Sequence, residues 1–133
     1  MTDRKLELIA AAKAARDQAY APYSNYKVGA ALLAESGRIH TGCNVENASY
    51  AATICAERTA AVKAISEGDT RFLALAVVTD GDTPGSPCGI CRQFLAEFGP
   101  DLKIYLANLD GRITESTLEE FLPRAFTPKF LNK

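Results

Sequence analysis

The sequence predicts a three-layer α/β domain, in which helices and the strands of a β-sheet share one core. Helical apolar spacing and short extended apolar runs alternate along the chain without an internal repeat. The chain has 133 residues, an ordinary length for one domain, and 47% of them are hydrophobic, which is enough to fill a core. Residues 1–133 are therefore expected to form a single domain.

The first expected element is a helix over residues 3–20, where alanine and leucine recur at helical spacing until Pro22 ends the pattern. Two mostly apolar segments follow at residues 28–34 and 38–43. Because Gly37 lies in the polar turn between them, the two segments are expected to pair as a β-hairpin.

The middle of the chain predicts a second helix over residues 55–66, which stops before Gly68, and a strand over residues 72–79. Nearly every residue of this strand is apolar, as in a strand that is buried on both faces. A third helix is expected over residues 88–98 and ends at Gly99.

The last part of the chain predicts a strand over residues 102–107 and a short helix over residues 117–122. Thr117 and Glu120 have the spacing of a capping box, in which each side chain satisfies a main-chain N–H group of the other residue. Pro123 closes this helix and is followed by an aromatic tail.

Charge and hydropathy exclude several classes of partner. Fifteen lysines and arginines against sixteen acidic residues give a formal charge of −1, which is too balanced for a protein that binds nucleic acid or anionic lipid. No run approaches the ~20 apolar residues of a membrane span, and the first residues lack the apolar segment of a signal peptide. We expect a cytoplasmic protein that binds neither nucleic acid nor membranes.

Cysteine spacing is the main clue to chemistry. Cys88 and Cys91 form a CxxC motif after Pro87 at a predicted helix start, where free main-chain N–H groups favour thiolates. A CxxC motif chelates a soft metal, but in redox proteins it also exchanges thiols. Cys55, at another predicted helix start, adds a third sulfur, and three thiolates favour zinc.

The roles of Cys43 and Glu57 separate two kinds of zinc site. As a fourth ligand, Cys43 would close a structural site, whereas as a core residue it would leave one zinc position open for water, as in a catalytic site. Glu57 lies two residues after Cys55, so a carboxylate could take and return a proton beside the metal. The alternative for Glu57 is a solvated acid in the first turn of a helix.

Positive charge should offset the thiolates, because three thiolates and a carboxylate leave a zinc site at −2. Arg58 lies three residues after Cys55 on the same side of the predicted helix, and Arg92 follows Cys91. Either guanidinium could hydrogen-bond a thiolate, although surface solvation is the alternative for both. Gln93 is assigned to the same layer of residues around the sulfurs.

The motif Cys55-Ala56-Glu57 with Pro87-Cys88-Gly89-Ile90-Cys91 resembles the [HC]-x-E and P-C-x-x-C signature of zinc-dependent nucleobase and nucleoside deaminases. Residues 21–31 and 42–50 are similar to the small homotetrameric cytidine deaminases in particular. The resemblance covers nearly the whole chain and implies the fold of that family, a three-layer α/β/α domain with a central mixed β-sheet of about five strands. It also implies one Zn(II) per subunit and a homotetramer with shared active sites.

The reaction that the resemblance implies is hydrolytic deamination of cytidine and 2′-deoxycytidine to uridine and 2′-deoxyuridine plus ammonia, in pyrimidine salvage. Zinc hydroxide would attack C4 of the base while Glu57 shuttles protons. The implied substrate contacts come from a ring that packs on the base, a ribose clamp, two main-chain groups and two aromatic residues at a subunit interface: Tyr26, Asn44, Glu46, Ala56, Ser86, Tyr50 and Phe126. The family usually has phenylalanine where Tyr26 stands.

Overall fold

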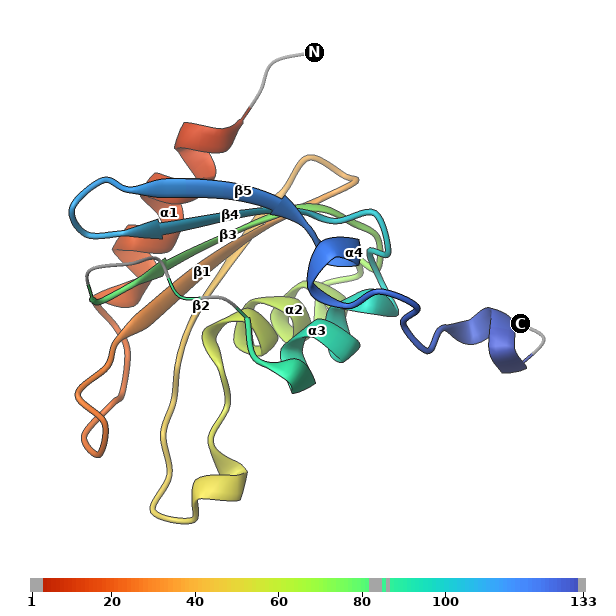
Figure 1. Ribbon diagram of the computed structural model, residues 1–133. Helices are drawn as coiled ribbons and strands as arrows, with labels where there is room; N and C mark the ends of the chain where they lie inside the picture. The colour runs from red at the N-terminus through yellow and green to blue at the C-terminus, as the bar shows by residue number, and fades with distance from the viewer. Residues whose placement is uncertain (1–3, 82–84, 86, 132–133) are drawn as a thin grey trace.

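The computed structural model describes residues 4–81, 85 and 87–131 and contains a five-stranded sheet with helices on both faces (Figure 1). The predicted α/β class is confirmed. The elements follow one another along the chain as α1 (Lys5–Arg16), β1 (Val28–Ala34), β2 (Ile39–Cys43), η1 (Tyr50–Ala52), α2 (Ala56–Ser66), β3 (Phe72–Thr79), α3 (Gly89–Ala96), β4 (Lys103–Asn108), β5 (Ile113–Thr117), α4 (Leu118–Phe121) and η2 (Pro128–Leu131).

The sheet is mixed, and its strand order is β2-β1-β3-β4-β5. Strands β3 and β4 run parallel, while the other neighbours are antiparallel, including the predicted β1–β2 hairpin. Strand β3 is central and buried along almost its whole length, as its apolar sequence predicts. Its C-terminal end therefore lies in the middle of the sheet edge, where α/β proteins commonly place their ligands.

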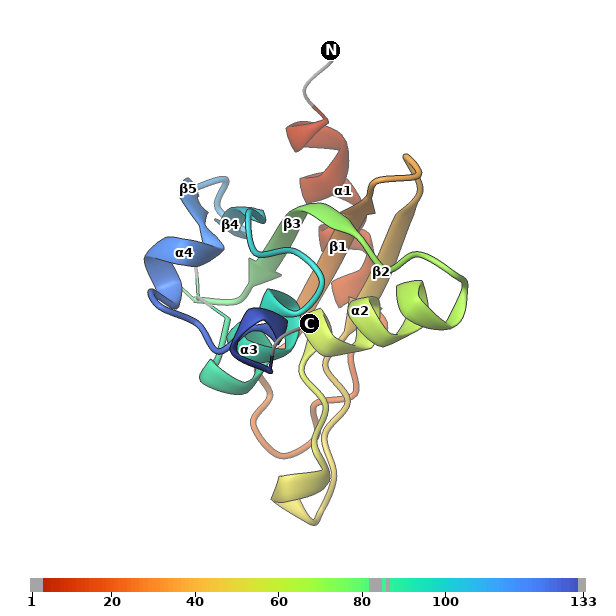
Figure 2. The same ribbon diagram turned by 90° about the vertical axis from the view of Figure 1, so that its right-hand side faces the viewer.

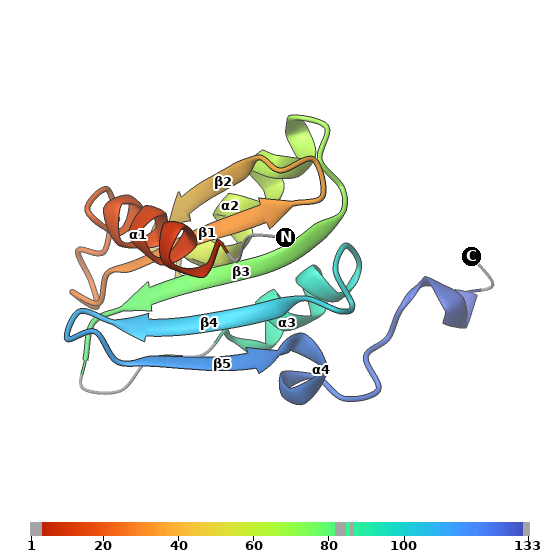
Figure 3. The same cartoon turned by 90° about the horizontal axis from the view of Figure 1, so that it is seen from above.

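Helix α1 covers one face of the sheet, and α2 and α3 cover the other (Figures 2 and 3). Two glycines allow close helix packing: a Cβ at Gly29 would lie 1.9 Å from the Ala12 carbonyl oxygen, and one at Gly42 would lie 2.5 Å from the Ala60 nitrogen. Within the described residues, no helix is long and apolar enough to cross a membrane.

Helix α1 ends at Arg16, four residues earlier than the sequence pattern predicts. The chain leaves the helix because Tyr20 pairs with the segment after β2. Its N–H donates to the carbonyl of Asn44 at 3.0 Å, and its carbonyl accepts from the N–H of Glu46 at 2.8 Å. Long-range pairing thus overrides local helix propensity and brings two loops together beside the sheet edge.

Candidate metal centre and active site

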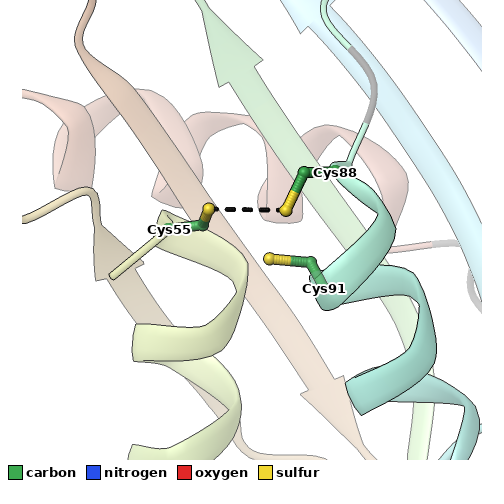
Figure 4. A group of neighbouring side chains, drawn as sticks. All are labelled: Cys55, Cys88 and Cys91. Atoms are coloured by element: carbon green, nitrogen blue, oxygen red, sulfur yellow. Dashed lines mark hydrogen bonds between the residues drawn. The ribbon is translucent and has the colours of Figure 1, made fainter. Parts of the chain in front are cut away.

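Three cysteine sulfurs meet where α2 and α3 begin (Figure 4). Cys55 is the N-cap residue of α2, Cys88 is the N-cap residue of α3, and Cys91 lies in the first turn of α3. All three sulfurs lie within 4.8 Å of one another, and the Cys55 and Cys88 sulfurs are 3.6 Å apart. Among the described residues, Cys43 is not part of this group; it pairs with Gly29 in the β1–β2 hairpin.

The cluster has the donor chemistry of a zinc site. A hydrogen bond from Cys91, aided by Arg58, lowers the pKa of Cys55 to about 5. The pKa of Cys91 is raised instead, because its thiol is hydrogen-bonded to the Cys55 sulfur and is partly desolvated. One thiolate therefore opposes ionisation of the next, and a divalent cation would allow all three to be thiolates together.

Arg58 supplies a positive charge at the cluster. One of its terminal nitrogens lies 3.9 Å from the Cys55 sulfur and donates to the Thr53 carbonyl at 3.1 Å. This placement agrees with the hydrogen bond to a thiolate that the sequence predicts.

Arg92 and Gln93 bind main-chain carbonyls. Arg92 donates to the carbonyls of Pro87 at 2.7 Å and Phe121 at 2.9 Å, which ties the segment before the CxxC motif to α4. Gln93 donates to the carbonyl of Phe126 at 2.8 Å. These hydrogen bonds therefore brace the elements around the sulfurs.

Glu57 is buried at the start of α2, with only 4% of its surface exposed. Desolvation raises its pKa to about 7, and the negative charge of Cys55 adds to the increase. A solvated surface acid would not show this burial, so the alternative reading of Glu57 is wrong. The buried carboxyl group faces the same cavity as Cys55 and Cys88.

That cavity has a volume of about 260 Å³ and opens beside the C-terminal end of β3. The loop before β1, the segment after β2, the start of α2 and the end of β3 all contribute to its wall. Its lining residues are Ser24, Tyr26, Val28, Asn44, Glu46, Thr53, Cys55, Ala56, Glu57, Val77, Thr79, Gly85 and Cys88. The cavity is thus lined by residues that lie apart in the sequence and that were predicted as site residues: Tyr26, Asn44, Glu46, Ala56 and Glu57.

Asn44 is 8% exposed and uses both ends of its side-chain amide within the protein. Its Oδ1 accepts from the Val28 N–H at 2.9 Å, and its Nδ2 donates to the Tyr26 carbonyl at 2.8 Å. The side chain therefore holds the start of β1 against the cavity.

Glu46 is also bound to the protein. Its carboxylate accepts from the main-chain N–H groups of Tyr23 at 3.0 Å and Ser24 at 3.1 Å, and from the Ser24 hydroxyl. The Ser24 hydroxyl makes the largest contribution to the lowered pKa of Glu46. Glu46 is thus a fixed carboxylate at the cavity wall.

Tyr50 and Phe126 lie outside the cavity lining. Tyr50 is 76% exposed at the tip of the loop after β2, where it meets Tyr23 edge to face. Phe126 is 56% exposed and stacks on Phe130 in the tail that extends away from α4 (Figure 3). Ser86 lies outside the described residues.

Sequence reasoning did not identify Thr79 and Gly85 as lining residues. The signal for Thr79 was its position as the last residue of a buried strand, because ligands commonly bind at the carboxyl ends of such strands. Gly85 carried no comparable signal, since its neighbours in the cavity come from distant segments.

An α/β/α domain with three converging cysteine sulfurs beside a buried carboxyl group has the arrangement of a zinc hydrolase. Residues 2–107 match the model of the cytidine and deoxycytidylate deaminase zinc-binding region. The chain belongs to this deaminase family, and it is a hydrolase with zinc as its cofactor.

Similar proteins span nearly the whole chain. A cytidine deaminase of Sporosarcina psychrophila is 55% identical, covering 95% of this chain and 93% of the relative. One from Halalkalibacterium halodurans is 53% identical over 98% of both chains. The crystal structure of cytidine deaminase from Burkholderia pseudomallei is 50% identical and superposes with a TM-score of 0.89, covering 95% of this chain and 100% of that one.

Proposed function

We propose that the protein hydrolyses cytidine and 2′-deoxycytidine to uridine and 2′-deoxyuridine plus ammonia, in pyrimidine salvage in the cytoplasm. The observation that carries this proposal is the buried Glu57 carboxyl group in the same cavity as the sulfur cluster. Relatives that cover almost the whole chain are named cytidine deaminases. The four free cysteines suit a reducing compartment.

In the mechanism, Cys55, Cys88 and Cys91 hold the metal, which supplies Lewis acidity that makes water nucleophilic near neutral pH. Glu57 accepts the proton of the attacking water and delivers it to the amino group that leaves as ammonia. Burial of the Glu57 carboxyl group raises its pKa toward neutrality, which favours both steps, because such a group can gain and lose a proton near neutral pH.

The cavity wall orients the nucleoside. Tyr26 offers an aromatic face to the base, while Glu46 offers the lone pairs that its protein hydrogen bonds leave free to a sugar hydroxyl. Asn44 acts mainly by holding Tyr26 in place. The main-chain groups of Ala56 and Ser86 border the base in this proposal.

The decisive experiment measures ammonia release from cytidine by the zinc-loaded protein and by a Glu57→Gln variant, with zinc content determined on both. We expect the variant to keep its zinc and to lose activity by a factor of about 10²–10⁴. Glu97→Gln, which changes an exposed acid after α3, is the matched control and should stay active. A zinc-loaded wild type that releases no ammonia from cytidine or deoxycytidine would overturn the proposal.

We further propose a homotetramer in which Tyr50 and Phe126 complete the active sites of neighbouring subunits. Both side chains are exposed and lie outside the cavity lining of their own chain. Burial of exposed aromatic rings is a common source of stability at subunit interfaces.

Complementation tests the shared site. Phe126→Ala should lower turnover, and mixed assemblies of Phe126→Ala and Glu57→Gln subunits should recover part of it, because each subunit supplies what the other lacks. Activity that is merely the sum of the two variants would show that Phe126 does not act across a subunit interface.

A further inference from the structure

One wall of the cavity is formed by Tyr26, Thr79 and Gly85, which come from three separate segments. The N–H of Gly85 donates to the Thr79 hydroxyl at 2.9 Å. A Cβ at residue 85 would lie 2.9 Å from the Tyr26 hydroxyl oxygen and 3.2 Å from the Thr79 Cγ2 atom. The Tyr26 hydroxyl thus occupies the space that any side chain at residue 85 would need.

The main chain of Tyr26 cannot retreat easily from such a contact. Its N–H donates to the Ser24 hydroxyl at 3.0 Å, and its carbonyl accepts from Asn44 at 2.8 Å. The next residue, Lys27, donates its N–H to Asp80 at 3.1 Å, and the same carboxylate binds Arg16 at 2.6 Å. The main chain of Gly85 is held as well, because its N–H donates to the Thr79 hydroxyl at 2.9 Å. The aromatic ring is therefore the part expected to move, and the ring forms the cavity wall.

We propose that Tyr26 and Gly85 act as a matched pair that sets the width of the nucleoside pocket, so that the residue at position 85 determines how tightly the substrate binds. The inference rests on the proposed deamination of cytidine. Glycine at position 85 lets the tyrosine hydroxyl lie within the wall, and any larger residue there tilts the ring into the pocket. Phenylalanine at position 26 lacks the atom that makes the contact, so it removes the dependence on glycine.

A double-mutant cycle tests the pair. We compare the zinc-loaded wild type with Gly85→Ala, Tyr26→Phe and the double variant, and measure KM and kcat for cytidine, zinc content and the apparent unfolding temperature. With tyrosine at position 26, Gly85→Ala overpacks the wall and should raise KM by about tenfold, with a smaller effect on kcat. In the phenylalanine background the same substitution should change KM by less than about twofold.

The design separates the Tyr26 hydroxyl from the two Thr79 atoms that face residue 85, because the Thr79 contacts are the same in both backgrounds. An equal rise in KM in both backgrounds would overturn the matched pair while leaving the deaminase activity established. If the wild type fails to turn over cytidine, the proposed function fails, and the unfolding temperatures still test the pair: Gly85→Ala should lower the temperature only with tyrosine at position 26.

Discussion

Asn44→Ala should destabilise the fold as well as weaken substrate binding. The side chain is buried, and both ends of its amide are bonded to the main chain on either side of Lys27. Removing it leaves the Val28 N–H and the Tyr26 carbonyl without those partners. If Asn44 served only as a ribose contact, the substitution would spare stability.

The hydrogen bonds set the size of the effect. A buried polar group that loses its partner costs about 1–3 kcal/mol. Two such groups in a partly buried place should lower the free energy of unfolding by about 2–4 kcal/mol. For a chain of this length, an unfolding entropy of about 0.28 kcal/mol/K converts that loss into a fall of roughly 7–14 °C in the unfolding temperature.

The assay pairs thermal and denaturant unfolding with KM for cytidine, on wild type and variant at equal zinc content. Asn47→Ala is the matched control, because its side chain accepts a single N–H, from Ser49, in an exposed loop; it should shift stability by less than about 1 kcal/mol. An Asn44→Ala protein with raised KM and unchanged stability would refute the reasoning and make the residue a substrate contact alone.

Two further predictions concern the metal and acid stability. Cys88→Ser should abolish stoichiometric zinc binding, whereas Cys43→Ser should retain it. Metal analysis after dialysis measures both, and loss of zinc from the Cys43 variant would contradict a three-sulfur site. Asp69 lies 2.7 Å from His40 and also binds Arg38, and the His40 hydrogen bond is the largest contribution that holds the pKa of Asp69 below its usual 3.8. This lowered pKa stabilises the folded protein above about pH 4, and the stabilisation is lost as the pH falls through the pKa of Asp69 in the folded state. Asp69→Asn should therefore make the free energy of unfolding in urea less sensitive to acid. The same pH dependence in variant and wild type would contradict this prediction.

The sequence predicted those elements whose local pattern and tertiary role agree. Strand β3 was predicted with its observed bounds because burial on both faces leaves a continuous apolar run. Strand β5 was not identified: its residues, Ile113–Thr117, form an exposed edge strand whose short mixed pattern depends on pairing with β4. The predicted end of the first helix was wrong for a related reason, because the pairing of Tyr20 is a long-range interaction that local spacing does not encode.

The site residues likewise fall into those with a local sequence signal and those whose role depends on long-range packing. Cys55, Glu57 and Cys88 were found because metal ligands and acids at helix starts are chemically distinctive residues at characteristic spacings. The second use of Asn44, as a clamp on Tyr26, and the contact between Tyr26 and Gly85 depend on loops that meet only in the folded chain. Residue type can predict what a side chain is able to do, while its packing decides which of those abilities it uses.

The arrangement of the helices explains how so much negative charge can be held in one place. Three thiolates, a zinc ion and an ionised Glu57 carry a net −2, and Arg58 offsets one of these charges. Helices α2 and α3 both begin at cysteines of the cluster, and the N-terminus of each helix contributes about half a positive charge. With these terms the zinc-loaded centre is close to neutral, so accumulated charge does little to oppose ionisation of Glu57. In the metal-free protein desolvation is the largest cause of the raised pKa of Glu57, ahead of the negative charge of Cys55.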